Sequence, residues 1–154
     1  MTTTRVAFVD VYVLRMGVTG LEVLALRRGP AGRCPGSWEA VHGSIEAGET
    51  PVEAALREMG EETGLAPERF YNLSRVESFY RHKTDEIGLI PVFAALVGAG
   101  AVRLSSEHDG CEWLPLPAAQ GRLNWPRERR ALEDIAIMLS QGDAGVLEDV
   151  LRVT

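Results

Sequence analysis

Three glutamates share one face of a predicted helix in the segment GSIEAGETPVEAALREMGEETGL, residues 43–65. At about 100° per residue, Glu58, Glu61 and Glu62 fall within a stripe about 100° wide. Like charges one turn apart destabilise a helix by about 0.2–0.5 kcal/mol, and Gly60 in the same turn costs roughly 1 kcal/mol relative to alanine. A hard divalent cation such as Mg²⁺ prefers oxygen ligands and reverses the sign of the carboxylate repulsion. The stripe is therefore a candidate metal site.

A longer pattern surrounds these acids. Gly43 is followed after five residues by Glu49, and after seven more by the run REMGEETGL, residues 57–65. A solvated acidic helix face is the simplest interpretation of the glutamates alone, but it does not explain fixed residue types at fixed spacings. The pattern resembles the Nudix box at every specified position, with the unbranched Met59 as its mildest departure. This resemblance favours a metal site.

Similarity to the Nudix family implies an α/β fold, an α/β/α sandwich with a mixed β-sheet in which a loop–helix–loop carries the box. Family members typically hydrolyse a nucleoside diphosphate linked to another group. The resemblance also implies that Arg57 and Glu49 orient the metal ligands. The implied ligands for Mg²⁺ or Mn²⁺ are the Gly43 carbonyl, Glu58, Glu61 and Glu62.

The reaction of such a site follows from charge. Bound metal ions neutralise phosphate oxygens and lower the pKa of a bound water. A carboxylate then accepts the proton of this water as it attacks phosphorus. Glu61 is one candidate for the base, and a carboxylate from a later loop is the other. Arg57 and Glu58 complete the predicted catalytic set.

Three further segments indicate a branch of the family. The run WEAVHGSIEAGE, residues 38–49, resembles the branch that includes dihydroneopterin triphosphate and dATP pyrophosphohydrolases. The runs SSEHDGCEWLPLPAA and LNWPRERRALEDI resemble it too, although the segment between Trp125 and Ala131 is one residue longer here than in that branch. In this reading Glu107 is a fourth metal ligand or the base, and an ordinary surface acid is the alternative.

Candidate substrate contacts come from four other positions. Arg27 can reach phosphates from the loop beside the box, and Trp125 can stack on a base or pterin ring. His42 and Tyr80 are candidates for the edge of the substrate pocket. The alternative for Arg27 is a solvated surface position, and the alternative for the other three is packing. The same two kinds of role, structural or substrate contact, remain open for His108.

The whole chain fits one domain, residues 1–154, with 45% hydrophobic and 25% charged residues. A net charge of −6 argues against a nucleic-acid polymer as partner, so a small phosphoanhydride substrate is expected. The N-terminus has no signal pattern, and the uncharged run 87–102 is too short for a membrane span. With only two cysteines and no spacing that suggests zinc or a disulfide framework, a reducing cytoplasm is expected, and the protein is expected to be a monomer or homodimer.

Strands and helices must bring these residues together. Strands are predicted at 5–15, 21–28, 38–41, 75–80, 88–97 and 112–116, the fifth at an edge or a bulge because of Pro91. Thr50, Pro51 and Glu53 predict a capped helix from residue 51, which Gly64 ends after residue 63. Helices are also predicted at 127–141 and 144–151. Strands with helices between and after them predict a sheet covered on both sides.

Several functions fit these features. The leading hypothesis is a metal-dependent pyrophosphohydrolase of a nucleoside or pterin triphosphate. The alternatives within the same fold are a hydrolase of nucleotide sugars, dinucleoside polyphosphates or oxidised nucleotides, a ligand sensor without turnover, and an isoprenoid diphosphate isomerase. All the box acids are present, which disfavours the sensor, and neither Cys34 nor Cys111 has the setting expected in the isomerase.

Overall fold

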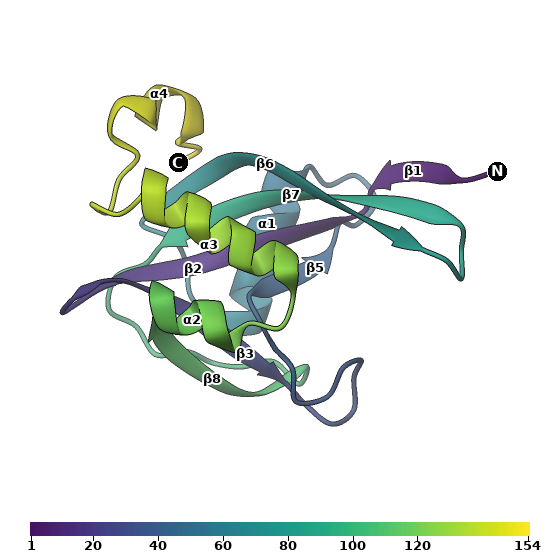
Figure 1. Cartoon of the computed structure of the whole chain (residues 1–154), viewed down its shortest axis with the longest axis horizontal. Helices are drawn as coiled ribbons and strands as arrows, with labels where there is room; N and C mark the ends of the chain where they lie inside the picture. The colour runs from purple at the N-terminus through teal and green to yellow at the C-terminus, as the bar shows by residue number, and fades with distance from the viewer.

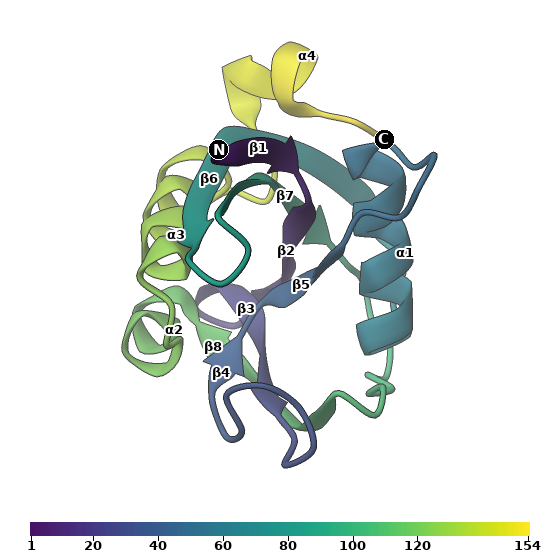
Figure 2. The same cartoon turned by 90° about the vertical axis from the view of Figure 1, so that its right-hand side faces the viewer.

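A mixed sheet of eight strands lies between two layers of helices in the computed structural model, which describes all residues from Met1 to Thr154. Helix α1 covers one face, and α2 and α3 cover the other, which confirms the predicted α/β/α sandwich (Figures 1 and 2). The strands are β1 (Thr3–Val6), β2 (Phe8–Gly17), β3 (Gly20–Arg28), β4 (Trp38–Glu39), β5 (Val41–Ser44), β6 (Arg69–Arg81), β7 (Glu86–Leu96) and β8 (His108–Pro115). The helices are α1 (Pro51–Thr63), α2 (Leu116–Arg122), α3 (Pro126–Met138), the 3₁₀ turn η1 (Gly145–Leu147) and α4 (Glu148–Leu151).

Strand β2 is the centre of the sheet. It pairs in parallel with β7 and in antiparallel with β3 and β5. Alternate residues of a strand point to opposite faces, so Val9 and Val11 belong to the core under α1, whereas Tyr12 and Leu14 belong to the core under α2 and α3. The short strand β5 joins only the first half of β2, where Val9 pairs with Gly43.

Helix α1 has the predicted bounds because its end signals are local. The Thr50 side chain accepts a hydrogen bond from the Glu53 N–H at 3.2 Å, and the Glu53 carboxylate accepts one from the Thr50 N–H at 2.8 Å. Gly64 ends the helix in the left-handed region, at φ 70°. The helix therefore starts and stops at fixed points relative to β5 and the following loop.

The strands differ from the prediction where pairing is long-range. The expected strand 5–15 is divided at Ala7, because β1 pairs with the first part of β7 and β2 with the second. Strand β6 begins at Arg69 rather than at residue 75, and it contains a bulge in which Ser74 has φ 52°. Pro91 was expected at an edge or a bulge, and the second alternative is correct: β7 lies inside the sheet, and Pro91 lies opposite Val76 at the end of this bulge.

The C-terminal part of the chain is helical, as predicted, with one addition. Helix α2 was not predicted, because Leu116–Arg122 is only seven residues long and contains Pro117 and Gly121. Helix α3 ends three residues before the expected boundary, and η1 with α4 occupies the expected third segment. No helix combines the length and apolar character that crossing a membrane would require.

The cap of α1 provides a test of this local structure. Thr50→Ala removes the acceptor of the Glu53 N–H, so we expect the free energy of unfolding to fall by about 1 kcal/mol. Thr50→Ser keeps the hydroxyl and is expected to stay within about 0.5 kcal/mol of the wild type. Urea unfolding followed by circular dichroism measures both, and an alanine variant as stable as the serine variant would contradict the capping role.

Candidate active site

The box acids lie in the second half of α1 (Pro51–Thr63), where this helix packs against β5. Gly43 has no side chain, and the Glu58 carboxylate occupies the space beside it, so that a Cβ added at residue 43 would overlap this carboxylate. A side chain at residue 43 would therefore displace the Glu58 carboxylate from this position, whereas the backbone conformation alone would allow one. Gly60, by contrast, has open space around it, and nothing in the structure explains a glycine there.

The three glutamates of the stripe are buried to very different degrees. The Glu61 side chain is 56% exposed and the Glu58 side chain 13%, whereas Glu62 is only 2% exposed. Neither carboxylate oxygen of Glu62 accepts a hydrogen bond. Burial, together with the nearby charges of Glu58 and Glu107, raises the pKa of Glu62 to about 10. Burial also raises the pKa of Glu58, although Arg57 opposes this shift.

Arg57 holds the exposed side of this cluster together. Its guanidinium donates to Glu49 at 2.6 and 3.0 Å, to Glu58 at 3.0 Å and to Glu61 at 3.3 Å. It also donates to the Ser44 carbonyl oxygen at 2.9 Å, which connects α1 to the end of β5. Arg57 and Glu49, the two residues expected to orient the ligands, are therefore in direct contact, and their orienting role stays a prediction.

A distant loop completes the cluster. Glu107 lies just before β8, and its backbone carbonyl accepts a hydrogen bond from the Gly29 N–H at 2.9 Å. One ligand atom from each of Glu62, Glu107 and His108 lies within 4.8 Å of the others. Two carboxylates and an imidazole at this spacing, with both Glu62 oxygens lacking a protein partner, fit a divalent cation.

The opposite face of β5 carries a second polar cluster. Asp10 is fully buried, and its carboxylate accepts from His42 Nδ1 at 2.7 Å and from Arg127 Nε at 2.8 Å. Burial alone would raise the pKa of Asp10, but the His42 hydrogen bond and the Arg127 charge hold it below its usual value. His42 stacks on Phe8 with ring centroids 5.1 Å apart, and the Arg127 guanidinium lies 5.4 Å from the centre of the Trp125 ring.

These contacts bring together some of the predicted substrate residues and not others. His42 and Trp125 both lie beside Arg127, and Trp125 is 41% exposed. Arg27 instead forms an ion pair with Asp109 at 2.7 Å. The Tyr80 hydroxyl donates to Asp85 in the β6–β7 hairpin at 3.0 Å. Because Phe79 packs on Phe8, the neighbouring Tyr80 points to the other face of the sheet, away from His42.

Three buried acids were not predicted from the sequence: Asp10, Glu39 and Glu128. Asp10 interrupts the apolar run VAFVDVYV, and Glu39 lies between Trp38 and Ala40 in β4. Glu39 is 4% exposed and binds both Arg28 and His108. A charged residue inside a buried strand is rare unless it is paired, and this signal was available in the sequence.

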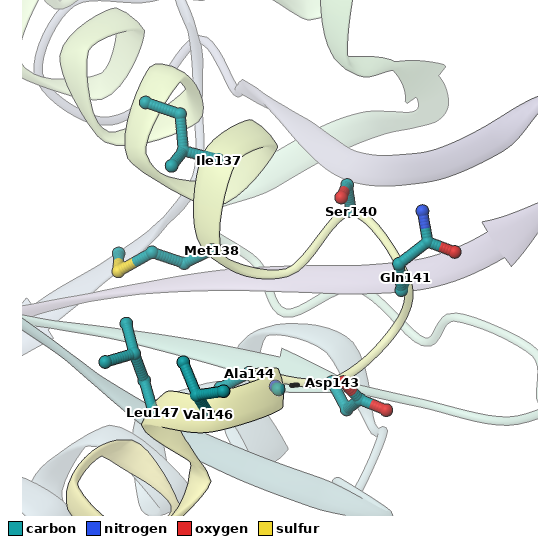
Figure 3. Close-up of a pocket in the computed structure, with 9 residues that line it drawn as sticks. Ile137, Met138, Ser140, Gln141, Asp143, Ala144, Val146 and Leu147 are labelled. Carbon is teal, nitrogen blue, oxygen red and sulfur yellow. Dashed lines mark hydrogen bonds between the residues drawn. The ribbon is translucent and has the colours of Figure 1, made fainter.

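A separate hollow of about 280 Å³ lies far along the chain from the acids, at the turn between α3 and η1 (Figure 3). Its lining is largely apolar, with Ile137, Met138, Val146 and Leu147 around it and Asp143 as the charged residue. None of the predicted site residues lines this hollow. The chemistry of the molecule is therefore concentrated at β5, α1 and the loop of Glu107.

Comparison with known proteins agrees with this geometry. Residues 4–135 match the model of the NUDIX domain. A Myxococcus xanthus protein called octanoyltransferase is 39% identical over an alignment of 109 residues, which covers 66% of this chain and 28% of that protein. The chain thus spans well under a third of the length of this relative, and the name belongs to the whole of that protein.

Solved structures share the fold. A C. elegans Ap4A hydrolase in a binary complex superimposes with a TM-score of 0.73 at 20% identity, covering 92% of this chain and 99% of that one. The E. coli dihydroneopterin triphosphate pyrophosphohydrolase gives a TM-score of 0.69 at 23% identity, covering 89% and 99%. At these identities the likeness establishes the architecture alone.

The raised pKa of Glu62 predicts a pH dependence of stability. Between the ordinary value of 4.5 and about 10, the folded state binds one proton more than the unfolded state. Without metal, the free energy of unfolding should therefore fall as pH rises through this window, by at most about 1.4 kcal/mol per pH unit. Glu62→Gln removes the titrating group, so it should reduce this fall.

Urea unfolding in a chelator at about pH 6, 7.5 and 9 measures the effect. Glu61→Gln changes an exposed carboxylate and is the matched control, expected to keep the wild-type slope. Saturating Mn²⁺ should stabilise the wild type most at high pH, where Glu62 gives up its proton to bind the cation. Equal slopes for the wild type and Glu62→Gln would show that Glu62 does not titrate in this way.

Proposed function

This chain belongs to the NUDIX family, and from that premise we propose that it is a metal-dependent pyrophosphohydrolase, which cleaves a nucleoside or pterin triphosphate to the monophosphate and pyrophosphate. One observation carries the proposal. Adjacent residues of β5 serve two clusters, since Gly43 borders the Glu58 carboxylate on one face while the His42 side chain joins Asp10 and Arg127 on the other. A phosphate chain at Gly43 would bring the ring of the same substrate to the His42 side.

The phosphate end is assigned to the acids of α1 and to Glu107. We propose that Glu58, Glu62 and Glu107 hold Mg²⁺ or Mn²⁺, with Glu61 and the Gly43 carbonyl completing the set predicted by the box. Such a cation, when bound, neutralises phosphate oxygens and lowers the pKa of a water. Glu61 and Glu107 are the exposed carboxylates of this group, and either can accept the proton of the attacking water.

The ring end is assigned to the cluster around Arg127. Trp125 presents an exposed indole beside the Arg127 guanidinium, and such a pair suits stacking against a flat heterocycle. Asp10 fixes Arg127 through two nitrogens, at 2.8 and 3.3 Å, so the guanidinium is held in place before a ligand arrives. Arg27 and Tyr80, which lie elsewhere, are not part of this proposed contact.

A substrate panel tests the function directly. Purified protein with Mg²⁺ or Mn²⁺ is incubated with dATP, other nucleoside triphosphates, dihydroneopterin triphosphate, ADP-ribose, nucleotide sugars and dinucleoside polyphosphates. We expect pyrophosphate release from triphosphates, no turnover in a chelator, and loss of most turnover in Glu62→Gln. Cleavage confined to diphosphate-linked sugars or dinucleoside polyphosphates would contradict the triphosphate assignment. Tight binding without turnover would indicate a sensor.

The ring contact makes a separate prediction. Stacking on an aromatic side chain contributes about 1–3 kcal/mol per base. Trp125→Ala should therefore raise KM by about 5–100-fold, with a much smaller effect on kcat, because the indole lies away from the box acids. Trp125→Phe keeps a flat ring and should stay near the wild-type KM. Steady-state kinetics on the best triphosphate measures both, and a wild-type KM for the alanine variant would place the ring elsewhere.

A further inference from the structure

The buried imidazole of His108 lies beside the acids of the proposed metal site. Its side chain is fully buried, and one ring nitrogen is within 4.8 Å of carboxylate oxygens of Glu62 and Glu107. Nε2 lies 2.9 Å from Glu39 Oε1. Nδ1 is also buried and has no hydrogen-bond partner.

The hydrogen-bond partner of Nε2 determines which of the two ring nitrogens carries the proton and which carries the lone pair. Glu39 also accepts from Arg28 Nη1, at 3.0 Å on the same oxygen, so it is a carboxylate held by a permanent cation. A carboxylate accepts hydrogen bonds, which means that Nε2 carries the proton. Nδ1 then offers a lone pair, as in the carboxylate–histidine–metal arrangements of many metal sites.

Packing alone does not account for this arrangement. A buried polar group without a partner costs about 1–3 kcal/mol, and here the Nδ1 atom of His108 and both oxygens of Glu62 all lack one. These unsatisfied atoms belong to two side chains of the same cluster. A cation bound between them would give each side chain a partner at once.

We propose that His108 is a ligand of the bound cation and that it makes the site prefer Mn²⁺ over Mg²⁺. This inference rests on the metal dependence of the proposed function, but it does not depend on the substrate. Mg²⁺ requires a near-ideal octahedron of oxygen ligands, whereas Mn²⁺, which also prefers oxygen, belongs to the first-row series whose members bind nitrogen sites, so one imidazole beside carboxylates disfavours Mg²⁺ more than Mn²⁺. Glu39 is then a positioning residue that acts through His108, and Arg28 acts through Glu39.

The test uses the full-length protein and the metal alone. Only three histidines are present, His42, His82 and His108, so each can be changed to glutamine in turn. Pulsed electron paramagnetic resonance of the Mn²⁺-loaded wild type should show a directly coordinated ¹⁴N nucleus. His108→Gln should abolish that signal, whereas His82→Gln, in the exposed β6–β7 hairpin, should keep it. A wild-type spectrum without coordinated nitrogen overturns the proposal even if no variant folds.

Affinities provide a second, independent readout. Competition between Mn²⁺ and Mg²⁺ gives the ratio of their dissociation constants, and urea unfolding checks that each variant is folded. His108→Gln replaces nitrogen by an amide oxygen, so Mn²⁺ affinity should fall about tenfold or more while Mg²⁺ affinity changes less. Glu39→Gln should weaken Mn²⁺ binding about 10–100-fold and keep the ¹⁴N signal, as expected of a residue that orients a ligand.

The outcomes separate this inference from the function. An unchanged Mn²⁺ to Mg²⁺ ratio in folded His108→Gln overturns the ligand role while leaving metal-dependent hydrolysis intact. Coordinated ¹⁴N that is lost in His108→Gln, in a protein that hydrolyses no triphosphate, would support the metal site and contradict the proposed reaction.

Discussion

The unpaired carboxylate of Glu62 is the constraint around which the site is built. A carboxylate at 2% exposure with no hydrogen-bond donor is among the least favourable groups that a protein can bury. Without a cation it must bind a proton, as its pKa of about 10 indicates. The stable sheet on one side and the capped helix on the other keep it in this position. The unfavourable environment would therefore favour the cation of the proposed function, because a divalent ion would relieve the burial cost and the repulsion from Glu58 together.

Strand β5 links this acid cluster to the rest of the molecule. It pairs only with β2, and its four residues have α1 on one face and the Asp10 cluster on the other. Gly43 allows Glu58 to approach, and His42 extends the polar surface through Arg127 to Trp125. Because His42 and Gly43 are consecutive, a small change in the pairing of β5 with β2 would shift both the contact with Glu58 and the proposed ring contact.

The sequence predicted what depends on local signals and missed what depends on distant partners. Thr50, Glu53 and Gly64 set the bounds of α1 within the helix itself, so both ends were correct. The start of β6 was missed, because residues 73–75 form an unpaired bulge that breaks the alternating pattern, and the strand continues across it only through pairing with β7 on both sides. The box pattern predicted that Glu58, Glu61 and Glu62 lie together, but not that their exposed fractions differ. That difference comes from the packing of α1 against β2 and β5. Asp10 and Arg127 are 117 residues apart, and no local pattern joins them.

The arginines near the site explain why an acidic protein would need a metal to bind a polyphosphate. Arg57 is committed to Glu49, and Arg127 to Asp10. Arg28 follows the same rule, since it binds Glu39. Each of these cations is already neutralised by a carboxylate, so the residues that could attract phosphate are largely compensated. With Glu58, Glu62 and Glu107 adding negative charge, a phosphate chain would be repelled unless a divalent ion came between them. In the proposed function, the ion pairs that fix the shape of the site would thus leave the attraction of the substrate to the cation.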